Sequence, residues 1–195
     1  LALELLEKAE HPSLTAHLVE ALRHPRPEVR TFALASIERG RLAGALEAIR
    51  RLLRSGTSAG VKAAAVRALC ALEGDEVEGT LPYLDDADQE ARIAALVGLF
   101  RYGGIGGVAA ALGRFNEMGA SAYPARKVLL AKVLGQIGER SFYQPLLPLL
   151  ADGSPEVRRE ALLSAGKIAH PRLLPPVIDN LKVGATRSEA ISTLV

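Results

Sequence analysis

The chain has 195 residues, 49% of them hydrophobic, but it has no run of about eighteen apolar residues that could cross a membrane. Its 24 basic and 22 acidic residues give a net charge of +2, which lacks the cationic excess typical of nucleic-acid-binding proteins. The single cysteine excludes an intrachain disulfide and favours a reducing compartment, so we expect a cytoplasmic protein.

A short sequence motif recurs along the chain about every thirty residues. The clearest copies end in Pro-Glu-Val-Arg, at 27–30 and at 155–158, and each is followed by an Ala-Leu pair. A basic residue at the equivalent position anchors every copy: Arg30, Lys62, Arg92, Arg126, Arg158 and Arg187. A period of this length is typical of stacked repeats, in which each unit buries its apolar face against its neighbours.

Each period contains two predicted helices, which we call helix A and helix B. Helix A is predicted wherever leucine, isoleucine or valine recurs at helical spacing, at 14–22, 46–53, 77–84, 108–115, 146–150 and 174–181. Helix B surrounds each anchor and carries apolar residues one position before it and three, four and seven positions after it, as in Val29, Ala33, Leu34 and Ile37. No sustained alternation typical of strands occurs, so the sequence predicts an all-α array of about six helix pairs.

Prolines mark several helix ends. Pro27 and Pro155 stand where a first-turn proline is tolerated, because the missing N–H would have no partner there. Pro82 and Pro148 fall inside predicted A helices and should bend them. The first and last residues fit partial B helices, so we expect one array over residues 1–195 that belongs to a larger protein and exposes stacking surface at both ends.

The second clear copy extends over a longer pattern. Residues 152–158 read Asp-Gly-Ser-Pro-Glu-Val-Arg, and an Ala-Leu pair and a Gly-Lys-Ile sequence follow. This pattern resembles HEAT repeats, specifically the short bacterial type first described in phycobilisome lyases. The resemblance covers essentially the whole chain and is strongest at 24–40 and 152–182. It implies a right-handed α-solenoid of antiparallel helix pairs, with the B helices lining a concave side.

The family pattern also carries an acidic residue six positions before the anchor, where it caps the turn and reaches a neighbouring repeat. Asp86 and Asp152 match this pattern, whereas His24, Gly56 and Ala120 depart from it. From the same resemblance we expect the basic anchors to bridge adjacent repeats by hydrogen bonds. The anchors are therefore not counted among the ligand-binding residues.

Catalytic, cofactor and metal patterns are weak. The segment 104–109 fits a Gly-x-Gly-x-x-Ala dinucleotide fingerprint, but no predicted strand precedes it. The four histidines lack the spacing of a metal site. Cys70 lies near the end of a B helix, where we expect a packed side chain. The sequence therefore predicts no catalytic residue, cofactor or metal, and a protein that is not an enzyme.

The predicted binding surface lies on the B-helix positions one, two, five and nine residues after each anchor, which point away from the buried stripe. Together they give an apolar centre with a basic rim. We expect seven residues to contact a partner: Ile93, Val97, Arg101, Arg67, Lys127, Arg159 and Leu163. Such a groove fits a peptide or helix with acidic residues beside aliphatic ones. The alternative is that Ile93 and Val97 pack between neighbouring helices.

We therefore expect a non-catalytic interaction, scaffold or regulatory module with an unidentified protein or peptide partner. The same array would suit the soluble regulatory domain of a multidomain membrane or signalling protein. The family name alone suggests a bilin lyase-like enzyme. Nucleic-acid binding would need the cluster Arg50, Arg51 and Arg54, which is diluted by Glu47 and by a shortage of aromatic residues. The partial repeats also allow end-to-end contacts between chains.

Overall fold

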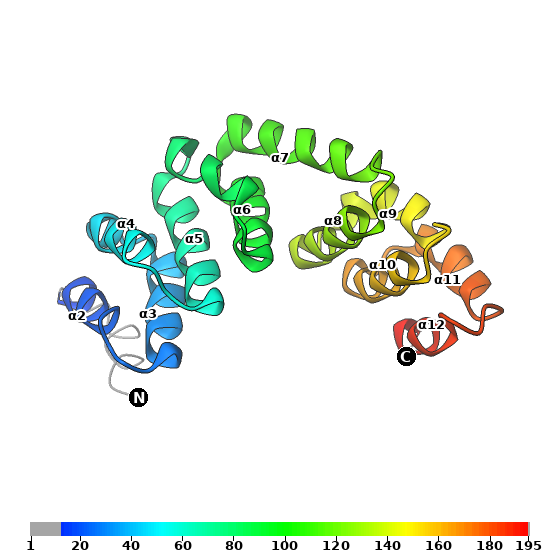
Figure 1. Cartoon of the computed structure of the whole chain (residues 1–195), viewed down its shortest axis with the longest axis horizontal. Helices are drawn as coiled ribbons and strands as arrows, with labels where there is room; N and C mark the ends of the chain where they lie inside the picture. The colour runs from blue at the N-terminus through cyan, green and yellow to red at the C-terminus, as the bar shows by residue number, and fades with distance from the viewer. Residues whose placement is uncertain (1–12, 195) are drawn as a thin grey trace. The chain divides into compact units, whose positions relative to one another are not determined.

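The computed structural model describes residues 13–194. Every regular element in that range is a helix, as the sequence predicts (Figure 1). The α-helices are α2 (Leu14–Ala21), α3 (Pro27–Gly40), α4 (Leu46–Arg54), α5 (Ala59–Glu73), α6 (Gln89–Tyr102), α7 (Gly104–Gly119), α8 (Pro124–Ile137), α9 (Tyr143–Leu150), α10 (Pro155–Ile168), α11 (Leu174–Asn180) and α12 (Arg187–Leu194). Short 3-10 helices are η1 (Ala43–Ala45), η2 (Val77–Gly79), η3 (Leu81–Asp85), η4 (Arg140–Phe142) and η5 (Pro171–Leu173).

The chain divides into two compact units, Leu1–Ala111 and Leu112–Val195. In unit 1, α3, α5 and α6 pack one against the next, while α2 packs on α3 and α4 on α5 (Figure 1). In unit 2, α8, α10 and α12 pack in the same order, with α9 on α10 and α11 on α12. Stacked helix pairs of this kind are the arrangement of an α-solenoid, which confirms the predicted fold class. The right-handed twist and a single array over residues 1–195 stay predictions.

The B helices begin at the residues that the sequence marks. Pro27 and Pro155 occupy the first turns of α3 and α10, and Pro124 does the same in α8. In α6 the side chain of Asp88 caps the helix, because it accepts a 2.8 Å hydrogen bond from the backbone N–H of Glu90. These features fix where each B helix starts relative to its anchor.

One predicted A helix is replaced by two 3-10 segments. Residues 77–84 were expected to form an α-helix, but the chain forms η2 and then η3, with Pro82 in the first turn of η3. A proline inside a continuous α-helix would lose a hydrogen bond and clash with the carbonyl four residues earlier, so the helix restarts at this point. Pro148, in contrast, lies inside a continuous α9, and the bend expected there stays a prediction.

Helix α5 shows how the repeats pack. Nine of its fifteen residues are buried, because α3, α4 and α6 contact it on several sides. Many of these buried residues are alanines, which let neighbouring backbones approach closely. Larger fully buried side chains fill the space between the pairs: Leu18, Leu34, Ile37, Ile49 and Leu69 in unit 1, and Leu134, Leu146, Leu150, Leu162 and Ile168 in unit 2.

Candidate functional site

The basic anchors hold the turn that precedes each B helix. The Arg92 guanidinium donates to the backbone carbonyl of Asp86, six residues earlier, at 2.6 Å. Arg158 makes the same bond to the carbonyl of Asp152, and Arg187 donates to that of Leu181 at 2.8 Å. Because the guanidinium is charged, these bonds are stronger than neutral ones. Each of these anchors therefore ties its turn to its own helix.

Neighbouring repeats are joined by lysine and aspartate. Lys62 Nζ lies 2.6 Å from Asp86 Oδ2, and Lys127 Nζ lies 2.7 Å from Asp152 Oδ2. Desolvation alone would raise the pKa of each carboxyl, but the hydrogen bond from the lysine and the one from the turn backbone outweigh it, so the pKa of both aspartates is lowered. The expectation that these two acidic residues reach a neighbouring repeat is confirmed.

The structure shifts one predicted anchor by a single residue. Lys127, and not Arg126, is the fourth residue of its helix, as Lys62 is in α5. Lys127 also makes the inter-repeat ion pair, whereas Arg126 is exposed. The apolar pairs beginning at Leu129 and at Leu130 both lie three and four residues after a basic side chain, so spacing alone fits either register.

A second set of bridging residues was missed by sequence reasoning. The Ser164 hydroxyl donates to the backbone carbonyl of Ala131 at 2.7 Å, and the Thr193 hydroxyl donates to that of Leu162 at 3.0 Å. Both hydroxyls stand six residues after an anchor and both reach the preceding B helix. The signal was present in the sequence as a small polar residue recurring at one position of an otherwise apolar stripe.

The predicted apolar centre of the binding surface is not exposed. Ile93 and Val97 each have only 2% of their surface accessible, so the expectation that they face a partner as exposed side chains is wrong. Helical phase assigns one buried side to each B helix, but α6 is buried continuously from Ile93 to Leu99. The alternative of packed side chains at these two positions is the one that the burial supports.

All three predicted rim cations bridge repeats. Lys127 pairs with Asp152, as described, and Arg67 Nε lies 3.5 Å from Glu38 Oε2. Arg159 Nε donates to the backbone carbonyl of Ala185 at 3.0 Å. These side chains therefore hold each unit together, whatever else they contact. Arg101, which was predicted to lie in the contact centre with Ile93 and Val97, is exposed on α6. Their contact with a partner stays a prediction.

In unit 2 one predicted residue keeps an exposed apolar side chain. Leu163 is 47% exposed and lies on α10 between Arg159 and Lys167, which are both exposed and stand one helical turn away on either side. We call these three residues the α10 stripe. It has the predicted pattern of an apolar centre with basic ends, on a smaller scale than the sequence suggested.

Comparison with known proteins bears on the same part of the chain. A family model described as HEAT repeats matches residues 115–195. Residues 115–195 are therefore similar to HEAT repeats. No curated protein matches the sequence. Among solved structures, human deoxyhypusine hydroxylase in complex with glycerol is similar, with 18% identity over 99% of this chain and 87% of that one and a TM-score of 0.43. A likeness this distant carries no argument about activity.

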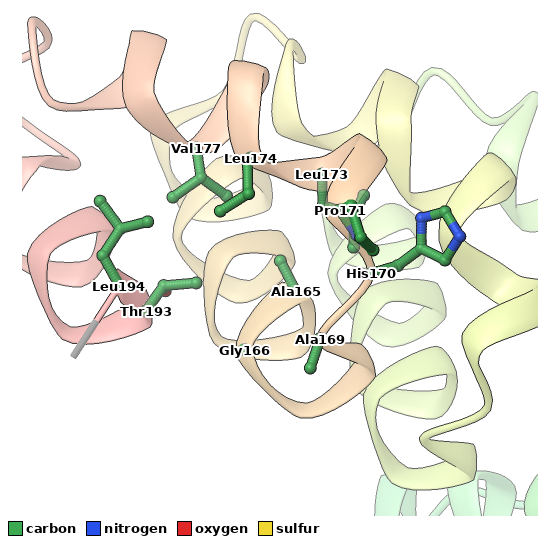
Figure 2. Close-up of a pocket in the computed structure, with 10 residues that line it drawn as sticks. All are labelled: Ala165, Gly166, Ala169, His170, Pro171, Leu173, Leu174, Val177, Thr193 and Leu194. Atoms are coloured by element: carbon green, nitrogen blue, oxygen red, sulfur yellow. The ribbon is translucent and has the colours of Figure 1, made fainter.

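The HEAT repeats of unit 2 contain an apolar pocket of about 270 Å³ (Figure 2). It is lined by Ala165, Gly166, Ala169, His170, Pro171, Leu173, Leu174, Val177, Thr193 and Leu194. At its edge the His170 ring stacks on Tyr143, with their centroids 4.0 Å apart.

The described residues do not bring catalytic, cofactor-binding or metal-binding side chains together at the α10 stripe or at the pocket. The Cys70 thiol is buried, which raises its pKa to about 12, although the hydrogen bond with Thr80 acts in the opposite direction. The segment 104–109 forms the start of α7, and α6 precedes it where a dinucleotide site needs a strand. Within residues 13–194, no group of three histidine, cysteine or acidic side chains could hold a metal, and no helix is long and apolar enough to span a bilayer.

Proposed function

We propose that this chain is a non-catalytic module that binds a protein or peptide partner through the exposed face of its B helices. The observation that carries the proposal is the α10 stripe, in which Leu163 is 47% exposed between two cations. An aliphatic side chain of a partner can pack on Leu163, while acidic side chains beside it reach Arg159 and Lys167. HEAT repeats generally mediate protein interaction, which agrees with this use.

The other function classes find less support. The cationic cluster considered for nucleic acid is already partly neutralised, because Arg50 pairs with Glu47 at 2.8 Å and with Glu73 at 3.1 Å. A lyase-like activity rests on the family name alone, and the Cys70 thiol, whose pKa burial raises to about 12, is a poor nucleophile near neutral pH. A regulatory domain of a larger signalling or membrane protein would use the same kind of contact, and we place the module in the cytoplasm.

The test compares two apolar side chains of similar exposure. Ile178 on α11 is 48% exposed and lies outside the α10 stripe, so Ile178→Asp makes the same chemical change as Leu163→Asp in the same unit. Wild-type protein and both variants are used to capture partners from a cell extract, and captured proteins are quantified by mass spectrometry. We expect at least one partner to bind wild type and Ile178→Asp but not Leu163→Asp.

Affinity for that purified partner then gives the size of the effect. Leu163→Asp should weaken binding by more than about 1 kcal/mol, or roughly fivefold, while thermal melting followed by circular dichroism stays unchanged. The proposal fails if Leu163→Asp keeps the full set of partners, or if both variants lose the same partners to the same extent.

A further inference from the structure

Three arginines share one cavity in unit 1. The cavity has a volume of about 280 Å³ and lies among α2, α3 and α4. Arg23 lines it from the turn after α2, and Arg30 and Arg51 line it from α3 and α4. Its apolar wall includes Val19, Leu22 and Leu52, and none of the described residues that line it is acidic. The three guanidinium groups make no ion pair with any residue from 13 to 194.

The repeat pattern shows which group is missing beside Arg30. At the equivalent places, Arg92 and Arg158 stand next to Asp86 and Asp152, and each arginine charge helps to lower the pKa of its neighbouring carboxyl. Six residues before Arg30 the chain has His24 instead. Arg30 therefore lacks the carboxylate that accompanies the other two arginines.

His24 makes the same hydrogen bond within the turn as Asp86 but supplies no carboxylate. Its Nδ1 accepts a 3.2 Å hydrogen bond from the backbone N–H of Arg26, just as Asp86 Oδ1 accepts one from Asp88 at 2.8 Å. The Arg30 guanidinium instead makes a 3.4 Å hydrogen bond to the Thr57 hydroxyl. A neutral hydroxyl at this distance compensates the charge poorly compared with a carboxylate.

The composition of the cavity defines the ligand that fits it. Three like charges around one space repel one another, and an oxyanion placed among them relieves this repulsion. Guanidinium groups bind carboxylates with two parallel hydrogen bonds, which suits a cluster made of arginine alone. The apolar wall formed by Val19, Leu22 and Leu52 favours an anion attached to an aliphatic group over a small hydrated ion.

We propose that this cavity binds an acidic side chain of a protein partner, with an adjacent aliphatic side chain packed on Val19, Leu22 and Leu52. The carboxylate takes the place that Asp86 and Asp152 occupy in their own repeats. The site lies in unit 1 and is separate from the α10 stripe. It rests on the proposed function only in that its ligand is a protein segment.

The first test uses short peptides and the arginine side chains themselves. Acetyl-Leu-Glu-Leu-Glu-Leu-amide is titrated into the full chain while the Nε–Hε signals of Arg23, Arg30 and Arg51 are followed by nuclear magnetic resonance. We expect saturable shifts of these signals and of the Leu22 and Leu52 methyl groups. The same peptide with glutamine in place of glutamate should bind about tenfold more weakly or not at all.

Charge reversal on α4 provides matched variants. Arg51 lines the cavity and Arg54 does not, although both are exposed on the same helix. Arg51→Glu should weaken binding of the glutamate peptide by about tenfold or more. Arg54→Glu should weaken it by less than about threefold. Equal effects of the two variants would show that only the general positive charge of unit 1 matters, and would overturn the assignment of the cavity.

His24→Asp tests the assigned chemistry most directly. An aspartate at this position would supply the missing carboxylate, so we expect it to compete with the peptide and weaken binding while the fold is kept. Full peptide affinity in His24→Asp would contradict the proposal. Tighter binding of inorganic phosphate or of a phosphoserine peptide would overturn the carboxylate assignment. Leu163→Asp should leave the peptide-induced shifts of the arginine signals unchanged. A failure of the cavity proposal can therefore be distinguished from a failure of the proposed function at the α10 stripe.

Discussion

Lys127 on α8 and Asp152 in the turn before α10 form a 2.7 Å ion pair, and the same kind of pair joins Lys62 on α5 to Asp86 in the turn before α6. Each aspartate also accepts a backbone hydrogen bond in its own turn. One carboxylate therefore organises the loop that starts a repeat and fastens that repeat to the one before it.

We expect Asp152→Asn to lower the free energy of unfolding by about 1 to 2 kcal/mol, because the ion pair is lost while the amide oxygen still accepts the Ser154 N–H. Urea unfolding monitored by circular dichroism measures this change. Asp179→Asn is the control, since the Asp179 pair with Lys182 is highly exposed and local to one turn. A loss of the same size in the control would argue against a special role for Asp152.

Stability should also depend on pH through these carboxyls. The pKa of Asp86 and of Asp152 is lowered in the folded protein, so the unfolded chain binds protons first as the pH falls. The stabilising contribution is therefore complete above the ordinary carboxyl pKa of about 4 and is lost as the pH falls through the lower folded values. Denaturant midpoints across this range should drop for wild type and drop less for the double variant Asp86→Asn/Asp152→Asn.

Gly135→Ala should destabilise unit 2. A β carbon on Gly135 would lie 3.0 Å from the Cα of Ser164, so α8 and α10 would have to move apart. Overpacking of this kind costs about 1 to 3 kcal/mol. Gly60→Ala is the matched change in α5, where the added β carbon meets nothing, and it should stabilise the helix by about 0.5 to 1 kcal/mol. Equal melting shifts in the two variants would show that close approach at Gly135 does not matter.

Cys70 should be inert in the folded protein. Burial raises the pKa of its thiol to about 12, so almost no thiolate is present at pH 8. We expect reaction with Ellman's reagent only through unfolding, at a rate that increases with urea in parallel with the unfolded fraction. Rapid reaction in the absence of urea would mean that the thiol is accessible in the native state.

Val97→Asp should unfold unit 1 and not merely weaken a surface contact. Val97 is 2% exposed, and an unpaired buried charge costs at least about 3 kcal/mol. Ile105→Asp introduces the same group at a side chain that is 92% exposed and should leave the melting temperature nearly unchanged. A native melting curve for Val97→Asp would show that this face of α6 is open.

The sequence was sufficient for the helix pairs because prolines, anchors and apolar spacing all act within one helix. The A element at 77–84 could not be predicted from leucine spacing, because Pro82 competes with that spacing and divides the segment. The register at Arg126 and Lys127 is ambiguous for a related reason: two basic residues stand side by side and both precede apolar pairs.

The exposure of B-helix positions depends on neighbours that spacing does not describe. A helical wheel separates one buried side from one open side, but α5 has neighbours on several sides and buries alanines around most of its circumference. The helical wheel predicts exposed side chains at Leu163 and Val97. Leu163 is exposed, whereas Val97 is buried. The arginine cavity was visible in the sequence only as a departure from the repeat pattern at His24. Its other two arginines come from the turn after α2 and from α4.

The contacts between B helices also restrict how such repeats can be recombined. Gly98 on α6 leaves room for Cys70 on the helix before it, whereas Gly135 on α8 leaves room for Ser164 on the helix after it. The glycine thus lies on the second helix of the α5–α6 pair but on the first helix of the α8–α10 pair. A chimera that placed α5 directly before α10 would bring Cys70 and Ser164 into a space that accepts one side chain. Exchange of these helices would therefore have to keep each glycine beside the side chain that it accommodates.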